Sequence, residues 1–94
     1  MVVGLLLVDL ILGSGHSLKE KRSVLLSLIK KLQNQFNISI AEVNYQDLWQ
    51  RSQLAVVCVN TEWQAVERIL QRIVAVIQSD PRCTLLNSEF RKIY

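Results

Sequence analysis

The first residues of the chain form a long apolar run that constrains the fold more than any other feature. Val2 to Leu12 is rich in Val, Leu and Ile, and a Gly-Ser-Gly segment at 13–15 ends it, a pattern typical of a β-strand. Both faces of this strand are apolar apart from Asp9, which fits a central strand in a covered sheet. The run is about half of the ~20 residues that a membrane-spanning helix needs, so we expect no membrane span.

Two segments have helical periodicity and a capping signal. Ser17 and Glu20 have the spacing of a capping box, in which the Ser17 hydroxyl accepts the Glu20 amide and the Glu20 carboxylate reaches back to Ser17. Thr61 and Gln64 repeat this spacing, and each signal predicts the start of a helix. The apolar stripes comprise Leu18, Leu25, Leu28, Ile29, Leu32 and Phe36 in the first helix and Trp63, Val66, Ile69, Leu70, Ile73 and Ile77 in the second.

Three further β-prone segments, at 38–43, 53–60 and 84–93, complete the order β-α-β-β-α-β. The usual solution for this order is a ferredoxin-like α+β sandwich, with an antiparallel sheet of order 4-1-3-2 and both helices on one face. The 94 residues fit one such domain, spanning 1–94. In this strand order the first strand separates Cys58 from Cys83, so we expect two unpaired thiols.

The chain offers little for catalysis, a cofactor or a metal. His16 is the one histidine, and neighbouring loop residues rarely supply the oriented base and oxyanion donor that a catalytic triad requires. One histidine and two widely spaced cysteines supply no ligand set for zinc. We therefore expect a protein that is not an enzyme, with no catalytic residues, no cofactor and no metal. No basic residues precede the apolar run as they do in a signal peptide, which favours the cytoplasm.

The predicted topology brings the start of the first helix and the hairpin tip at 44–51 to the same end of the sheet. The formal charge of +3 permits contact with a polyanion, and helix-start amides together with cations suit a phosphate. A purely structural cluster stays open as the alternative, with Asp47 paired to a cation and Trp49 covering the core. The candidate anion- or RNA-binding residues are Ser17, Lys19, Lys21, Arg22, Trp49 and Arg51.

The outward face of the predicted sheet is also apolar, and the sequence lacks the RNP signatures of RNA-binding sheets. A contiguous apolar surface on a small domain is covered most economically by a second copy, so we expect a homodimer. The candidate dimer-interface residues are Val3, Leu5, Leu7, Val57 and Val59.

Several segments resemble the motifs of the YlxP-like family of small bacterial proteins. They are Ser-Leu-Lys-Glu-Lys-Arg at 17–22, Phe-Asn-Ile-Ser at 36–39 with Ala-Glu-Val at 41–43, and Gln-Asp-Leu-Trp-Gln-Arg at 46–51. The resemblance spans nearly the whole chain. It implies a ferredoxin-like fold, a bacterial cytoplasmic protein and genes that often neighbour those for translation initiation and ribosome maturation. It implies no assigned activity.

Two functions stay open at this point. The first is a non-enzymatic cytoplasmic accessory protein that associates with RNA or the ribosome through the basic end of the sheet. The second is a homodimeric module that binds a small anion or a protein partner. Phosphate contacts of the first kind would be salt-sensitive and nearly independent of RNA sequence, so the salt dependence of co-sedimentation with ribosomes distinguishes the two.

Overall fold

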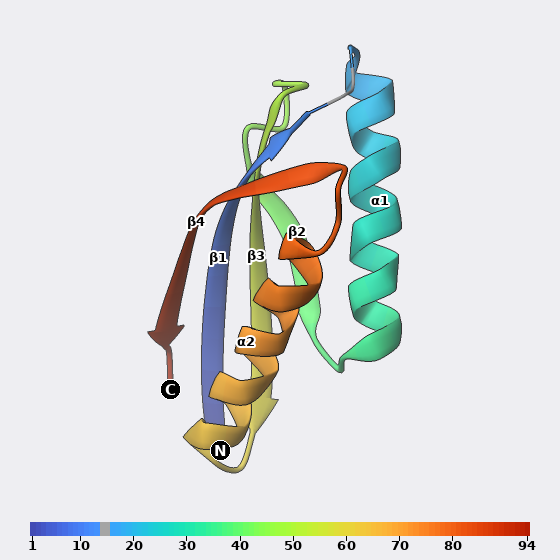
Figure 1. Cartoon of the computed structure of the whole chain (residues 1–94). Coiled ribbons are helices and arrows are strands. Elements are labelled where there is room, and N and C mark those ends of the chain that lie inside the picture. Colours follow the sequence, from blue (N-terminus) through green and yellow to red (C-terminus); the bar gives the residue numbers. More distant parts are fainter. Residues whose placement is uncertain (14–15) are drawn as a thin grey trace.

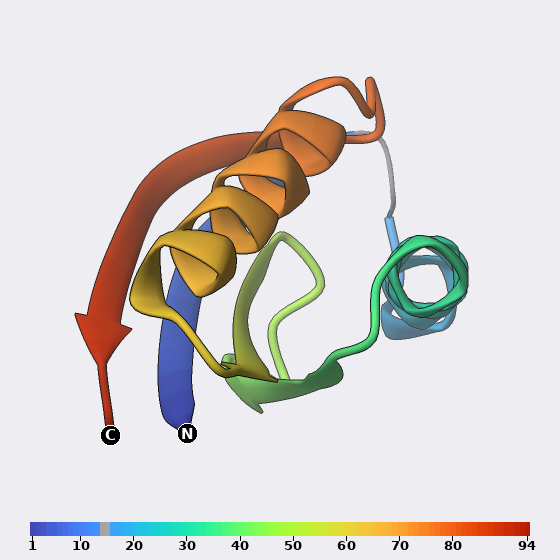
Figure 2. The same ribbon diagram turned by 90° about the horizontal axis from the view of Figure 1, so that it is seen from below.

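A computed structural model describes residues 1–13 and 16–94 as one antiparallel sheet with two helices on the same side (Figures 1 and 2). The elements are β1 (Val2–Leu12), α1 (Leu18–Gln35), β2 (Ser39–Asn44), β3 (Arg51–Asn60), α2 (Trp63–Gln78) and β4 (Cys83–Lys92). The strand order β2-β3-β1-β4 confirms the predicted ferredoxin-like topology. Ser14 and Gly15 of the predicted strand-ending segment lie outside the described residues.

β1 is the central strand, paired with β3 on one side and β4 on the other. Its residues alternate between the two faces as the sequence predicts, and the inward ones face the helices. α2 crosses the inner face over β1 and β3, whereas α1 stands beside β2 (Figure 2). The buried apolar side chains are Leu6, Val8, Leu10, Leu12, Leu25, Leu28, Leu32, Phe36, Leu54, Val56, Cys58, Val66, Leu70, Ile73, Ile77 and Cys83.

Gly4 allows α2 to lie directly against β1. A Cβ atom at this position would overlap Cγ1 of Val66 and would lie 3.2 Å from Cζ3 of Trp63. Val66 is fully buried, so it has no free space into which it could move. The absence of a side chain at Gly4 therefore sets the distance between the first turns of α2 and the sheet.

The two helix starts differ, although the sequence gives them the same spacing. The Ser17 hydroxyl accepts the Glu20 amide at 3.1 Å as predicted, but the Glu20 carboxylate accepts the amide of His16 rather than that of Ser17. The capping box predicted for α2 is wrong. Its N-cap is Glu62, which makes no side-chain capping bond, because Thr61 donates both its amide and its hydroxyl to Oδ1 of Asn60.

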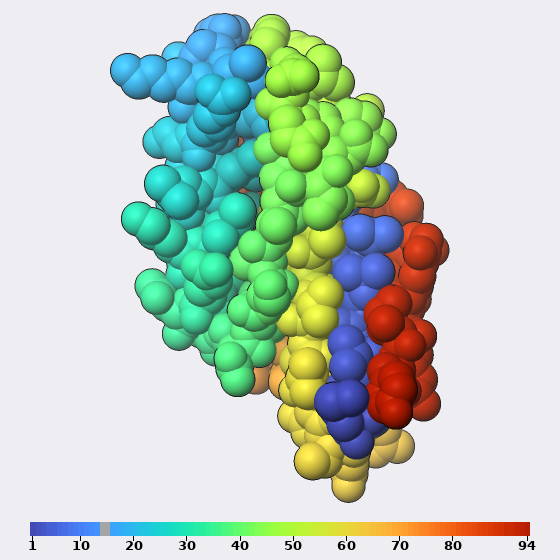
Figure 3. All heavy atoms as spheres, turned by 180° about the vertical axis from the view of Figure 1, so that it is seen from behind, coloured from blue at the N-terminus to red at the C-terminus, as the bar shows by residue number. Residues whose placement is uncertain are grey.

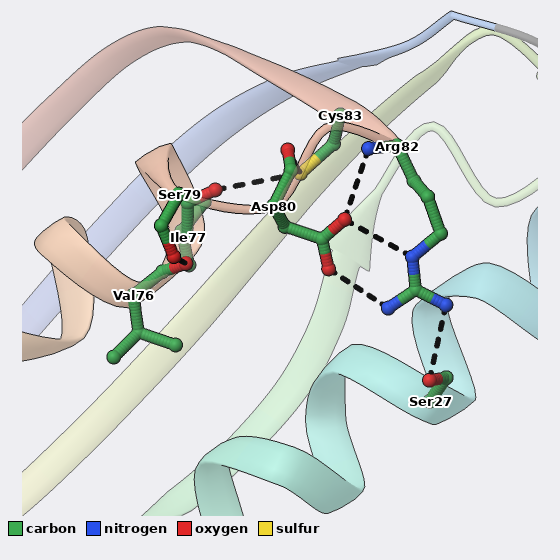
Figure 4. A network of polar contacts seen from close by, with 7 residues as sticks. All are labelled: Ser27, Val76, Ile77, Ser79, Asp80, Arg82 and Cys83. Atoms are coloured by element: carbon green, nitrogen blue, oxygen red, sulfur yellow. Dashed lines mark hydrogen bonds and ion pairs between the residues drawn. The ribbon is translucent and has the colours of Figure 1, made fainter.

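A buried carboxylate ties the turn between α2 and β4 to α1 (Figure 4). Asp80 accepts hydrogen bonds from Nε and a terminal nitrogen of Arg82, at 3.0 and 2.8 Å, and from the Arg82 amide at 2.9 Å. The other terminal nitrogen of Arg82 donates to the Ser27 hydroxyl on α1 at 3.1 Å. The hydrogen bonds from Arg82 outweigh burial and lower the pKa of Asp80 to about 2.

Cys58 and Cys83 are buried free thiols on β3 and β4, with β1 between their strands as expected. Burial raises the pKa of both, so both thiols stay protonated at neutral pH. Within the part of the chain that the structure describes, no helix is long and apolar enough to span a bilayer.

Replacing Gly4 with Ala tests the close contact between α2 and β1. We expect the free energy of unfolding to fall by about 1–3 kcal/mol, because the new methyl group overpacks a filled site. Gly13→Ala is the control, since a Cβ there meets no atom within 4 Å. Urea denaturation of both variants gives the comparison, and equal losses of stability would contradict the proposed role of Gly4.

The Asp80 carboxylate predicts a pH-dependent term in stability. Its folded-state pKa of about 2 lies below the ordinary value of 3.8, so its contribution is present above about pH 4 and is lost as the pH falls through 2. Asp80→Asn should lower the free energy of unfolding by about 1–2 kcal/mol at pH 7. The gap between this variant and the unmodified protein should close between pH 4 and pH 2.

Glu89→Gln is the matched control for this pH titration, because Glu89 pairs with Arg91 at the surface, where both side chains are about half exposed. Its effect at pH 7 should be small. A gap for Asp80→Asn that is constant from pH 7 to pH 2 would show that the carboxylate charge does not supply the stability.

Candidate functional site

The start of α1 and the tip between β2 and β3 lie together at one end of the sheet (Figure 3). Nζ of Lys21 donates to the carbonyl oxygen of Tyr45 at 2.6 Å and to that of Leu48, which confirms the predicted convergence of the two segments. We use the name end surface for the residues of these segments that line this end of the molecule: His16, Lys19, Arg22, Trp49 and Arg51.

Lys21 itself is not part of the end surface. Its side chain is 0% exposed, and its ammonium forms an ion pair with Oε2 of Glu42 at 3.0 Å in addition to the two carbonyl contacts. The Ser52 hydroxyl donates to the same carboxylate oxygen at 2.6 Å. Since an ammonium has three donors, these partners occupy all of them. Lys21 is therefore not available to a phosphate in solvent, and we remove it from the candidate anion-binding residues.

The tip has a defined backbone shape that allows it to accept these bonds. Tyr45 has φ of 65°, in the left-handed region, where a bulky residue is uncommon. Its amide donates to Oδ1 of Asn44 at 2.9 Å, and its carbonyl oxygen accepts the amide of Leu48 at 3.0 Å as well as Lys21. The turn is thus held by hydrogen bonds from three different groups.

Trp49 and His16 stand next to each other where the two segments meet. Their ring centroids are 6.0 Å apart with an angle of 57° between the planes, and Trp49 is 36% exposed. The Arg51 guanidinium carbon lies 4.8 Å from the centroid of the Tyr45 ring. A hollow of about 510 Å³ opens beside these groups and is lined by Ile11, Leu12, Gly13, His16, Trp49, Gln50 and Arg51.

Capping uses several of the polar groups that the sequence suggested for anion binding. Ser17 accepts the Glu20 amide through its hydroxyl and the Lys21 amide through its carbonyl oxygen. The Glu20 carboxylate accepts the His16 amide, which places a negative charge at the helix start. The exposed cations that stay available are Lys19 and Arg22, and within residues 1–13 and 16–94 Asp47 forms no ion pair with them.

The predicted dimer-interface residues share the outward face of the sheet. Val3 pairs with Val59 and Leu5 with Val57 in the β1–β3 register. Val59 is 57% exposed, whereas Val3, Leu5, Leu7 and Val57 are half-buried by their neighbours in the sheet. The same alternation places Arg51, which pairs with Ile11, on this face one row beyond Asp9 and Gln53, so the outward face meets the end surface at the ends of the strands.

The side chains of the end surface can contact a ligand. The rings of His16 and Trp49 and the Arg51 side chain line an open hollow, and Lys19 and Arg22 are exposed near the start of α1. None of the described residues form a group of three or more His, Cys, Asp or Glu side chains that could hold a metal. Such a surface can stack on planar groups and pair with anions.

Because the ammonium of Lys21 is buried and fully bonded, we expect Lys21→Met to lower the stability of the fold strongly. This change leaves two carbonyl oxygens and the Glu42 carboxylate without their donor, so the free energy of unfolding should fall by about 3 kcal/mol in urea denaturation. Lys19→Met is the control, because Lys19 is exposed and lies two positions before Lys21 in the same helix turn. Adding Glu42→Gln to Lys21→Met should recover part of the loss, and similar effects of the two single changes would contradict this role.

Two comparisons with known proteins, one with a relative and one with a family, agree with the resemblance seen in the sequence. A solved structure of a mutant of SnoaB, a cofactor-independent oxygenase from Streptomyces nogalater, is 14% identical with a TM-score of 0.48 over 97% of this chain and 91% of that one. The "Uncharacterized protein YlxP" of Bacillus subtilis (strain 168) is 40% identical over 80 residues, which are 85% of this chain and 87% of that protein. Residues 3–90 match the family described as "Protein of unknown function (DUF503)". The chain belongs to this family.

Proposed function

We propose that the protein is a non-enzymatic accessory protein of the bacterial cytoplasm that binds RNA, free or within the ribosome, through the end surface. The observation that carries the proposal is the placement of Trp49, partly exposed, beside His16 and Arg51 at one hollow. Aromatic and guanidinium groups gathered at an open site are the groups with which proteins bind unpaired bases.

Trp49 supplies the contact that does not depend on charge. Stacking of a base on an aromatic side chain contributes about 1–3 kcal/mol and tolerates any base. Trp49 is 36% exposed, so a single-stranded loop or end can reach its ring, whereas a base within a duplex cannot unstack to do so. The end surface therefore favours single-stranded segments.

The exposed Lys19 and Arg22 and the half-buried Arg51 supply the phosphate contacts. Each contact with single-stranded RNA adds about 0.7 to the slope of log K against log salt, so three contacts give a slope of roughly −2. Affinity of this kind is modest at physiological salt and depends little on sequence. Such an affinity suits a protein that binds to an assembly in which other binding contacts are also available.

The buried Lys21 supports this function indirectly. Its bonds to Tyr45 and Leu48 fix the tip on both sides of its turn and so hold Trp49 in place before any ligand arrives. A site already held in its binding geometry loses less conformational entropy on association. The same tip without this anchor would have to become ordered as RNA binds.

Reversing two charges of the end surface tests the proposal. Arg22→Glu with Arg51→Glu should weaken binding to a single-stranded RNA and to ribosomal subunits by at least roughly tenfold and flatten the salt slope by about 1.4, because two phosphate contacts are lost. Fluorescence anisotropy and sucrose-gradient co-sedimentation at several salt concentrations measure both quantities.

The control carries the same charge change at the other end of the sheet: Arg68→Glu with Lys92→Glu. Arg68 lies in the second turn of α2, and Lys92 pairs with Gly4 near the start of β1. Circular dichroism establishes that both variants fold. If both lose affinity equally, net charge rather than the end surface controls binding, and if neither loses affinity the proposal is wrong.

A further inference from the structure

Figure 3 looks onto the outer face of the sheet, where the side chains of β2, β3, β1 and β4 lie next to one another. Strand register places four residues side by side in each row across the sheet. Read from β2 to β4, three successive rows are Ser39-Val57-Leu5-Arg91, Ala41-Ala55-Leu7-Glu89 and Asn44-Gln53-Asp9-Asn87.

The side chains of these rows change in polarity along the strands and in size and charge across the strands. Along the strands, apolar side chains occupy β1 and β3 in the first two rows, and four polar side chains make up the third. Across the strands, the β2 positions of the first two rows hold small residues and the β4 positions hold long charged ones. Glu89 and Arg91 form an ion pair with each other at 3.0 Å, so this margin carries no net charge.

We propose that the outer face binds a second copy of this chain, in a dimer whose two-fold axis runs parallel to the strands and between β1 and β3. The order β2-β3-β1-β4 is symmetric about that line. Rotation therefore places β1 over β3 of the second copy and β4 over β2 of the second copy, and each row meets the same row.

Side-chain size is complementary in this arrangement. Leu7 lies over Ala55 of the second copy, and Leu5 lies over Val57 of the second copy. At the margins, the long side chains of Glu89 and Arg91 lie over the small Ala41 and Ser39 of the second copy. Larger side chains thus face smaller ones throughout the two rows, which is how facing sheets interdigitate.

The third row is polar, so its side chains can form hydrogen bonds in the same arrangement. Asp9 and Gln53 are direct neighbours in one row, so the proposed axis brings Asp9 over Gln53 of the second copy, whose amide is a donor.

The face fits a second copy better than a nucleic acid. The twelve residues of the three rows include no aromatic ring for stacking, and their charged groups are one cation and two carboxylates. The covered area is small, at about 19 Å across four strands and about 20 Å along six residues. It falls below the ~800 Å² per partner of a standard interface, so the dimer should dissociate on dilution.

The first test is the concentration dependence of mass. Sedimentation equilibrium should show the unmodified chain shifting from monomer to dimer as its concentration rises. Leu5→Glu should be a monomer at concentrations where Leu26→Glu still forms the dimer, because Leu26 is 54% exposed on α1, away from the sheet face. An unmodified chain that is a monomer throughout, or a Leu5→Glu chain that dimerises normally, overturns the proposal.

The second test distinguishes the proposed axis from any other. Leu7→Ala homodimers would place Ala over Ala and leave cavities, and Ala55→Leu homodimers would place Leu over Leu and clash. A mixture of the two variants restores large over small at both contacts, so native mass spectrometry should show the heterodimer roughly tenfold in excess of its statistical share. A statistical mixture would overturn the proposed axis even if the chain dimerises.

Discussion

The buried ammonium of Lys21 is the interaction on which the arrangement at the end of the sheet depends. It joins three elements, because it lies on α1 and bonds to the tip carbonyl oxygens and to the Glu42 carboxylate of β2. A charge buried in this way is stabilised only while every donor has a partner, so loss of one contact weakens the others. The position of the tip, and of Trp49 within it, therefore depends on the packing of α1 against the sheet.

Much of the fold could be predicted because it is encoded in local periodicity. Alternation defines β1, helical spacing defines the stripe of α2, and the element order leaves one usual topology. The burial of Lys21 was not predicted, because local sequence patterns assign a charged side chain to the solvent-exposed surface. Its spacing to Leu25 and Leu28 on one face of α1 was the available signal. A cation within an apolar stripe indicates either that it has a buried partner or that the stripe was assigned wrongly. The sequence near Lys21 could not decide between these, because its partner Glu42 lies on β2.

Other features could not be predicted, because they depend on contacts that the local sequence does not specify. Ser17 and Thr61 have the same spacing to a residue three positions later, yet one caps a helix and the other bonds to Asn60. The left-handed Tyr45 and the hollow beside Trp49 depend on how α1 meets the tip. Which residues converge was predictable from topology, whereas which of them stay accessible to a ligand was not.

The two proposals also constrain each other through geometry. A two-fold axis parallel to the strands leaves the ends of both sheets at the same end of the dimer, so both end surfaces would point in one direction. An axis across the strands would place them at opposite ends instead. Two weak RNA-binding surfaces on one side can contact the same RNA, and the second contact then forms at a high effective concentration. The modest affinity expected of each end surface is thus compatible with firm binding by the dimer, and dilution would weaken both together.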